Sequence, residues 1–183
     1  MRRIAFALLA VLATSSVAAA QEQTLAGDGL ESGGFGAPVV KFSDVGGEFA
    51  VFAGARGGWI IDHTFVLGLG GYGLASNIGD DPFEREVEFG YGGLELEYIK
   101  NSDKLVHFTI YALVGGGAVV YLDDVVDGVF VLEPAVNLIV NVTQWFRLGV
   151  GGGYRFVEGA NSDLSNKELS APVGVLTFKF GSF

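Results

Sequence analysis

Apolar side chains alternate with polar or glycine positions along much of this chain. In residues 146–157, for example, Phe146, Leu148 and Val150 are apolar, whereas Arg147 and Gly149 lie between them. A period of two predicts β-strands with one apolar face, because successive side chains of a strand point to opposite sides. Eight segments of this kind are predicted, with boundaries uncertain by a few residues: 35–42, 49–61, 65–75, 87–99, 105–121, 130–142, 146–157 and 171–183.

The connections between these segments alternate in length. Short turns are expected at 62–63, 101–104 and 143–144. Longer connections are expected at 43–48, 76–86, 122–128 and 158–170. An even-stranded membrane barrel with both termini on the periplasmic side has this alternation. The pattern therefore predicts an all-β fold, an eight-stranded antiparallel up-and-down transmembrane β-barrel, whose narrow interior is filled by side chains.

Two other architectures are compatible with part of the pattern. Residues 105–122 carry no formal charge and are long enough for a membrane helix. Glycines 115–117 and the neighbouring β-branched residues disfavour a helix there, so a strand is favoured. A soluble lipocalin-like barrel would bury an apolar interior under a polar exterior. Here the charged strand positions fall on the face opposite the apolar one, which favours a membrane barrel.

The first residues have the order of a secretory signal peptide. Two arginines precede an apolar run over 4–13, and alanines occupy 18–20. We expect cleavage after Ala20, because small residues fit the cleavage pattern and the apolar run is shorter than the roughly 20 residues that span a bilayer. Residues 21–34 are polar, glycine-rich and without periodicity, and are predicted to be a flexible N-terminal segment. The barrel domain is then 35–183.

Net charge and cysteine content exclude a nucleic-acid partner and disulfide bonds. Cleavage would remove Arg2 and Arg3, so the formal charge would change from −10 to −12. An acidic chain is a poor partner for nucleic acid, which binds basic surfaces. The sequence has no cysteine, so disulfides cannot stabilise the fold.

Charged residues also occupy strand positions that should face the barrel interior. They are Lys41, Arg56, Glu95, Glu97, Glu133, Arg147, Arg155 and Lys179. Buried charges are costly unless paired, so we expect an ionic network that plugs the lumen. Arg147 and Arg155 lie on the strand after Glu133, which makes bidentate pairs with Glu133 plausible. The alternative is a narrow pore in which the basic excess favours anions.

The longer connections are strongly acidic. Thirteen acids lie in these connections or directly beside them, opposed by Arg85 and Lys167: Asp44, Glu48, Asp80, Asp81, Glu84, Glu86, Glu88, Asp123, Asp124, Asp127, Glu158, Asp163 and Glu168. No spacing matches a twelve-residue calcium loop, so a solvated acidic surface, bridged to lipopolysaccharide by bulk divalent cations, is favoured over a calcium or magnesium site. We predict no cofactor.

Catalytic patterns are missing from the sequence. His63 and His107 fall at predicted periplasmic turns, and neither has a serine nearby in a nucleophile context. No nucleophile elbow, phosphate loop or zinc spacing occurs. The chain is predicted not to be an enzyme. A structural or adhesive role through acidic outer loops is expected, with a narrow channel as the alternative and a lipid-modifying enzyme third.

Two stretches carry a family resemblance. Residues 133–155, with Glu133-Pro134-Ala135-Val136-Asn137 at their start, and residues 47–61, with Arg56-Gly57-Gly58-Trp59, resemble small outer-membrane β-barrel proteins of Gram-negative bacteria, of the OmpA and OmpX size. The resemblance implies residence in the outer membrane, contact with its lipid and lipopolysaccharide, and insertion by the barrel assembly machinery. It implies no reaction. Candidates for the aromatic girdles at the membrane interfaces are Trp59, Tyr98, Trp145 and Tyr154.

Phe183 departs from the family pattern. The resemblance implies an insertion signal that ends in an aromatic residue on the outward face of the last strand. Leu176, Phe178 and Phe180 set one phase, whereas Phe183 falls in the other. A bulge near Gly181 would restore the phase; without one, Phe183 faces inward.

Overall fold

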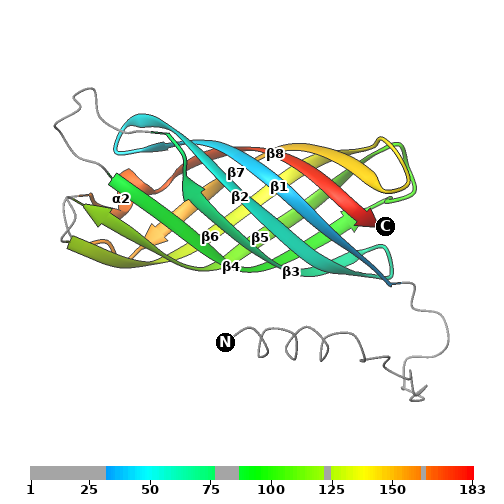
Figure 1. Cartoon of the computed structure of the whole chain (residues 1–183), viewed down its shortest axis with the longest axis horizontal. Helices are drawn as coiled ribbons and strands as arrows, with labels where there is room; N and C mark the ends of the chain where they lie inside the picture. The colour runs from blue at the N-terminus through cyan, green and yellow to red at the C-terminus, as the bar shows by residue number, and fades with distance from the viewer. Residues whose placement is uncertain (1–31, 77–86, 122–124, 162–163) are drawn as a thin grey trace, which may run out of the picture. The chain divides into compact units, whose positions relative to one another are not determined.

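Eight antiparallel strands close into a barrel in which every strand pairs with its sequence neighbours and β1 also pairs with β8 (Figure 1). The computed structural model describes residues 32–76, 87–121, 125–161 and 164–183. The strands are β1 (Ser32–Val45), β2 (Glu48–Ile61), β3 (Phe65–Leu74), β4 (Val87–Lys100), β5 (Val106–Tyr121), β6 (Val125–Asn141), β7 (Phe146–Glu158) and β8 (Ala171–Ser182). The predicted fold class is confirmed. The predicted signal peptide, 1–20, lies outside the described residues.

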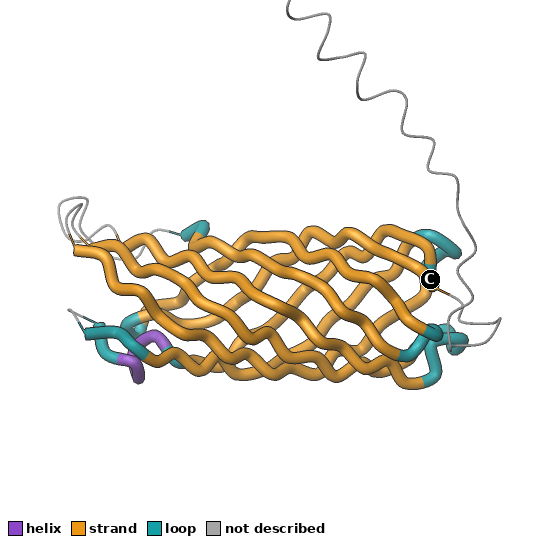
Figure 2. The backbone as a smooth tube through the Cα atoms, turned by 90° about the horizontal axis from the view of Figure 1, so that it is seen from below, coloured by secondary structure: helices purple, strands orange, loops and turns teal. Residues whose placement is uncertain are grey.

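The two ends of the barrel differ. One end, here called the turn end, carries the turns after β2, β4 and β6 together with the C-terminus (Figure 2). The other end, here called the α2 end, carries the β1–β2 hairpin and a one-turn helix, α2 (Asn166–Leu169), which precedes β8. The turn end has short connections, as predicted.

The strands extend further at the α2 end than the sequence indicated. Val45 pairs with Glu48, so Gly46 and Gly47 alone form the β1–β2 turn, with φ values of +65° and +86°. Positive φ at both positions is the geometry of a two-residue hairpin, which glycine adopts without strain. The long connection predicted at 43–48 was therefore wrong. The one predicted at 122–128 was also too long, since β6 begins at Val125. Asp44 and Glu48 pair within the β1–β2 ladder although they are acidic. A charged side chain is compatible with a strand where the strand end faces water.

The N-terminal boundary also shifts. Ser32, Gly33 and Gly34 pair with the last residues of β2, although they fall within the segment 21–34 predicted to be flexible. Their lack of periodicity hid them, because glycine-rich residues at a strand end are held by the partner backbone rather than by side-chain packing. Residues 21–31 lie outside the described residues.

The strand predicted within 105–121 is confirmed as β5. No helix in the described ranges is long and apolar enough to cross a membrane. The outer surface carries large apolar side chains all around the barrel; Leu69, Trp59 and Phe49 are 64%, 58% and 69% exposed, respectively. Charged side chains on the inner face are instead buried. As predicted, the outer surface is apolar and the charged strand positions face the interior.

The lumen is layered along the barrel axis. A large apolar cluster, which includes Phe52, Phe89, Leu113 and Leu169, extends toward the α2 end. A smaller one lies at the turn end and consists of Phe35, Ala37, Ile60, Val66 and Ile99, with Phe183 packed against it. The charged side chains lie along the same inner face, and most of them are ion-paired.

Candidate functional site

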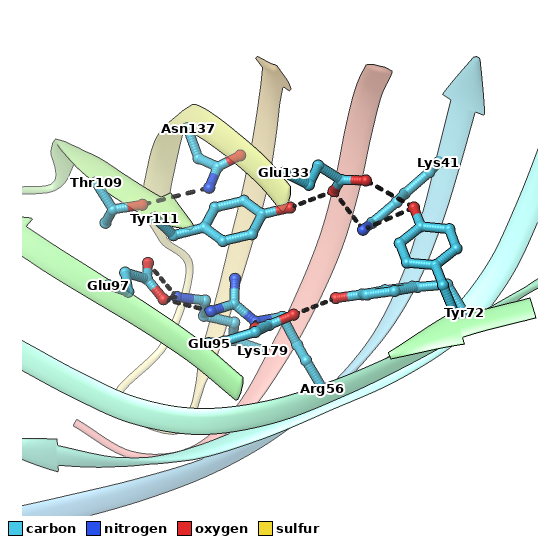
Figure 3. A network of polar contacts seen from close by, with 11 residues as sticks. Lys41, Arg56, Tyr72, Glu95, Glu97, Thr109, Tyr111, Glu133, Asn137 and Lys179 are labelled. Atoms are coloured by element: carbon cyan, nitrogen blue, oxygen red, sulfur yellow. Dashed lines mark hydrogen bonds and ion pairs between the residues drawn. The ribbon is translucent and has the colours of Figure 1, made fainter. Parts of the chain in front are cut away.

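All the charged residues predicted to face the interior do so, with at most 9% of each exposed. They come from six strands: Lys41 from β1, Arg56 from β2, Glu95 and Glu97 from β4, Glu133 from β6, Arg147 and Arg155 from β7, and Lys179 from β8. Six of these residues form two ion-paired groups (Figure 3). The two β7 arginines have other surroundings.

The first group is centred on Glu133. Lys41 donates a 2.5 Å hydrogen bond from Nζ to Oε1, and Tyr111 donates a 3.1 Å bond to the same oxygen. Tyr91 donates to Oε2 at 2.6 Å. The Lys41 ammonium also lies 3.2 Å from the centre of the Tyr72 ring, a cation–π contact. Both carboxylate oxygens of Glu133 are thus occupied.

The second group joins two carboxylates and two cations. Arg56 pairs through Nε with Glu95 at 2.5 Å and through Nη2 with Glu97 at 2.8 Å. Lys179 donates to both oxygens of Glu97, at 2.7 and 2.9 Å. Tyr72 donates to Glu95 at 2.6 Å, so its hydroxyl binds this group while its ring lies under Lys41 of the first. Tyr72 therefore connects the two groups.

The two groups are electrically balanced, with three cations and three carboxylates between them. Charge-assisted hydrogen bonds of this kind offset the desolvation of buried ions. The pairing itself differs from the expectation that Arg147 or Arg155 would pair with Glu133. Lys41 takes that place because side chains of strands that are not neighbours meet across so narrow a lumen. Pro134 also leaves a gap in the β6–β7 ladder, between the Leu132 and Ala135 pairs.

Arg155 links the barrel wall to the α2 end. Its Nε donates to the carbonyl oxygen of Leu169 at 2.9 Å, and its Nη2 donates to that of Asp44 at 2.8 Å. Its guanidinium lies 4.7 Å from the Phe52 ring centre and 5.1 Å from that of Phe89. Arg155 thus ties β7 to α2 and to the β1–β2 hairpin.

Arg147 lies at the turn end, with its guanidinium 4.0 Å from the centre of the Phe183 ring. That ring stacks on Phe35 with a centroid separation of 6.4 Å. The β1–β8 register is continuous in phase from Gly174 to Ser182, so no bulge occurs at Gly181. Phe183 therefore lies on the lumen side, and its role as an insertion signal stays a prediction.

The four predicted girdle residues are all on the outer surface, between 38% and 60% exposed. Trp59, Tyr98 and Trp145 lie near the turn end, and Tyr154 lies toward the α2 end. Trp145 stacks on Phe180 with ring centres 6.0 Å apart, and Tyr154 lies 4.7 Å from Phe156. Aromatic side chains therefore mark both ends of the apolar surface.

Sequence reasoning missed the tyrosines of the lumen, although a signal was present. Tyr91 shares its phase on β4 with Glu95 and Glu97, and a phenol in a lumen of this kind needs a hydrogen-bond acceptor.

Both histidines lie at the turn end; His107 is buried, with Nδ1 3.3 Å from the Lys104 carbonyl oxygen.

Part of the acidic surface lies outside the described residues. Those acids are Asp80, Asp81, Glu84, Glu86, Asp123, Asp124 and Asp163. Within the described ranges, no group of three or more His, Asp or Glu side chains could hold a metal ion. The preference for a solvated acidic surface stays a prediction.

Comparison with known proteins identifies the architecture. No family model and no curated protein matches the chain. Among solved structures, Neisserial surface protein A (NspA) is similar with a TM-score of 0.63 and 12% identity, over 85% of this chain and 99% of that one. Ail, the attachment invasion locus protein of Yersinia pestis, has a TM-score of 0.53 and 10% identity, over 82% of this chain and 96% of its own. Its complex with the heparin analogue sucrose octasulfate gives a TM-score of 0.52. At such identities the likeness shows the fold alone, and that fold is the small eight-stranded outer-membrane β-barrel.

Proposed function

We propose that this chain is an integral outer-membrane β-barrel with a closed lumen, which acts at the cell surface through its α2 end. The observation that carries the proposal is the inverted distribution of side chains. Large apolar residues cover the outer face, and the buried ion pairs lie on the inner one. Soluble monomers rarely expose apolar patches of more than a few hundred Å², whereas a lipid-facing barrel requires such a surface.

The strand lengths fit a bilayer. β1 and β2 each have 14 residues. At about 3.3 Å per residue and a tilt of roughly 40°, such a strand rises about 35 Å along the barrel axis. This rise exceeds the apolar band of about 25 Å in outer-membrane barrels. The aromatic residues at both ends are suited to the two interfaces, with the turn end in the periplasm.

Closure of the lumen is supported by the contacts across it. Lys41 of β1 reaches Glu133 of β6, and Lys179 of β8 reaches Glu97 of β4. These pairs span the interior between strands that are not neighbours. Apolar clusters lie on either side of them, and the buried side chains of Phe52 and Leu113 support a closed lumen. Eight strands leave room for little beyond side chains.

The α2 end has the features of an ordered acidic surface. The carbonyl oxygen of Glu168 accepts a 2.9 Å bond from the Gly46 amide, which joins α2 to the β1–β2 hairpin. The carboxylate of Glu168 accepts bonds from the Ser165 amide and hydroxyl, and these lower the pKa of Glu168. Glu168 is therefore charged at neutral pH. NspA is named a surface protein and Ail an attachment protein, and we extend a surface role to this chain.

The acidic surface bears on the choice of partner. A polyanion such as the heparin analogue bound by Ail would be repelled by Glu158 and Glu168, which are both exposed here. We therefore expect this surface to bind a cationic partner, or lipopolysaccharide through divalent cations.

Conductance tests the closed lumen. The refolded mature protein is placed in a planar bilayer after its folding has been checked by gel mobility before and after boiling. We expect no discrete conductance steps from the folded barrel. Steps that change in a Glu133→Gln variant would contradict closure and would make the chain a narrow channel, the alternative function. Cell binding by wild-type protein and by a Glu158→Gln/Glu168→Gln variant then tests the surface role.

A further inference from the structure

The charges on the lumen wall do not cancel. Five cations face three carboxylates, and the two ion-paired groups use three of the cations. Arg147 and Arg155 are left. Arg155 is fully buried and donates to two carbonyl oxygens at the α2 end. Arg147 lies at the turn end, where it has a different environment.

Arg147 is a buried cation without a counter-ion. Only 9% of it is exposed, and no ion pair joins it to a carboxylate in the part of the chain that the structure describes. Its Cα partner on β8 is Lys179, another cation. The face of the Phe183 ring is its favourable contact, and a cation–π contact compensates only part of the desolvation of a buried ion.

An open hollow lies beside this guanidinium. It has a volume of about 720 Å³, and its lining includes Arg147, Phe183, Asn141, Gln144, Ser102 and Asp103. Asn141 donates from Nδ2 to the carbonyl oxygens of Ser102 and Lys104, at 3.0 and 2.9 Å. These bonds fix the orientation of the amide. Its Oδ1 is buried and has no hydrogen-bond partner. The hollow thus holds an unpaired cation, and its wall contains a buried acceptor without a partner.

We propose that this hollow binds a small oxyanion of the phosphate class through Arg147. The parallel N–H groups of the guanidinium match the geometry of a tetrahedral oxyanion. The Phe183 ring packs against one face of the guanidinium and leaves its N–H edge for a ligand. A phosphate and a phosphodiester both present two or more negatively charged or partly charged oxygens to such an edge. The proposal rests on the proposed function only in placing the turn end in the periplasm.

The phosphate has two possible sources. Trp145 lines the hollow and also stacks on Phe180 at the outer surface, so the hollow opens next to the expected membrane interface. A phospholipid headgroup and a free phosphate compound are therefore both within reach. Arg147 would contact the same chemical group in either case.

Calorimetric titration tests the site. Sodium phosphate is titrated into the refolded full barrel in an uncharged detergent at constant ionic strength. We expect saturable binding to wild type and a loss of at least about tenfold in phosphate affinity in Arg147→Gln. Lys104→Gln, which removes an exposed cation from the same end, should bind like wild type. Equal affinity of the wild type and Arg147→Gln, or no binding to wild type, would overturn the proposal.

A second variant covers the case in which Arg147→Gln does not fold. Gln144 is exposed and lines the hollow, so Gln144→Glu adds a negative charge without disturbing the core. It should weaken phosphate binding several-fold; unchanged binding would count against the site. The titration is then repeated in vesicles of phosphatidylcholine, which has no net charge. Weaker apparent binding there than in the uncharged detergent assigns the site to a lipid headgroup, and equal binding assigns it to a soluble phosphate. A barrel that folds and conducts nothing, yet binds no phosphate, removes this site and leaves the proposed function intact.

Discussion

Lys41 and Glu133 lie 92 residues apart in sequence and meet across the lumen, with Nζ 2.5 Å from Oε1 and both side chains fully buried. Their strands, β1 and β6, are not neighbours in the sheet. The pair therefore acts as a tie across the barrel rather than along its wall. Tyr91 and Tyr111 complete the contacts of the carboxylate.

Breaking this pair should destabilise the barrel strongly. Glu133→Gln leaves the Lys41 ammonium buried without its counter-ion, and removing one partner of a buried pair costs about 3–5 kcal/mol. The free energy of unfolding, measured by denaturant titration in detergent micelles, should fall by that amount. Lys100→Met, which removes an exposed cation near the end of β4, is the matched control and should change it little.

The double variant separates pairing from packing. Lys41→Met/Glu133→Gln removes both charges, so it should be more stable than Glu133→Gln alone. If Glu133→Gln unfolds at the wild-type denaturant concentration, the ion pair contributes nothing and the closure of the lumen must come from the apolar clusters.

A second prediction concerns Gly70 on β3, which faces the lumen. A Cβ placed there would collide with a carboxylate oxygen of Glu95 and lie 2.9 Å from the Tyr72 hydroxyl oxygen. Glu95 cannot swing away easily, because Arg56 and Tyr72 hold it. Gly70→Ala should therefore lower the free energy of unfolding by about 1–3 kcal/mol, as overpacking does.

Gly71 gives the control for this experiment within the same strand. A Cβ at Gly71 meets no atom within 4 Å, and the residue faces outward. Gly71→Ala should leave the stability unchanged or slightly raised. Equal effects of the two substitutions would mean that the lumen side of Gly70 is less crowded than the structure indicates.

A third prediction concerns Arg155, whose two carbonyl partners fasten the α2 end. Arg155→Met leaves the carbonyl oxygens of Leu169 and Asp44 without their donor. Local opening of α2 should become easier while the barrel stays folded. Trypsin cleavage after the exposed Lys167 should then be faster by at least about tenfold, since hydrogen bonds to a charged group are worth about 1.5–3 kcal/mol each.

A Lys167→Gln variant identifies the cleavage site on the gel. An unchanged cleavage rate in folded Arg155→Met would show that α2 is held by Leu169 packing alone.

The sequence predicted which face each charged residue takes but not which partner it finds. A period of two places Glu95 and Glu97 on the inner face without ambiguity. Partners depend on the tilt and stagger of the strands, which bring Lys41 of β1 to the level of Glu133 of β6. Alternation along one strand carries no information about that level. The adjacency of β6 and β7 predicts a pair between Glu133 and a β7 arginine, whereas the narrow lumen lets side chains of strands that are not neighbours meet.

The strand ends show a similar limit. Gly46-Gly47 is a sequence typical of a two-residue hairpin, but Asp44 and Glu48 around it suggested a longer loop. Charged residues are excluded from a strand only where it faces lipid, and Asp44 and Glu48 lie at strand ends.

The tyrosines of the lumen could have been found from their phase. The hollow beside Arg147 could not, because it is formed by turns whose arrangement the alternation does not determine.

The last prediction concerns the aromatic residue that directs membrane insertion. Phe183 was the sequence-based candidate, yet its ring lies on the lumen side against Phe35 and Arg147. Phe180 is 42% exposed on the outer face and stacks on Phe146 with ring centres 4.9 Å apart. If the assembly machinery recognises outward aromatic residues, Phe180→Ala should lower the folded, heat-modifiable protein in outer-membrane fractions several-fold. Phe183→Ala should lower it less.

Loss of lipid contact must be separated from loss of recognition. Leu96 is 58% exposed on the outer face of β4, so Leu96→Ala removes a comparable lipid contact away from the last strand. Purified Phe180→Ala and Leu96→Ala should refold to similar extents in detergent, because no assembly machinery is present there. In cells, Phe180→Ala alone should accumulate unfolded, because only β8 would carry the signal. Equal levels of the two variants in the outer membrane would mean that Phe180 acts as an ordinary lipid-facing residue, and a defect greater in Phe183→Ala would return the signal to the terminal residue.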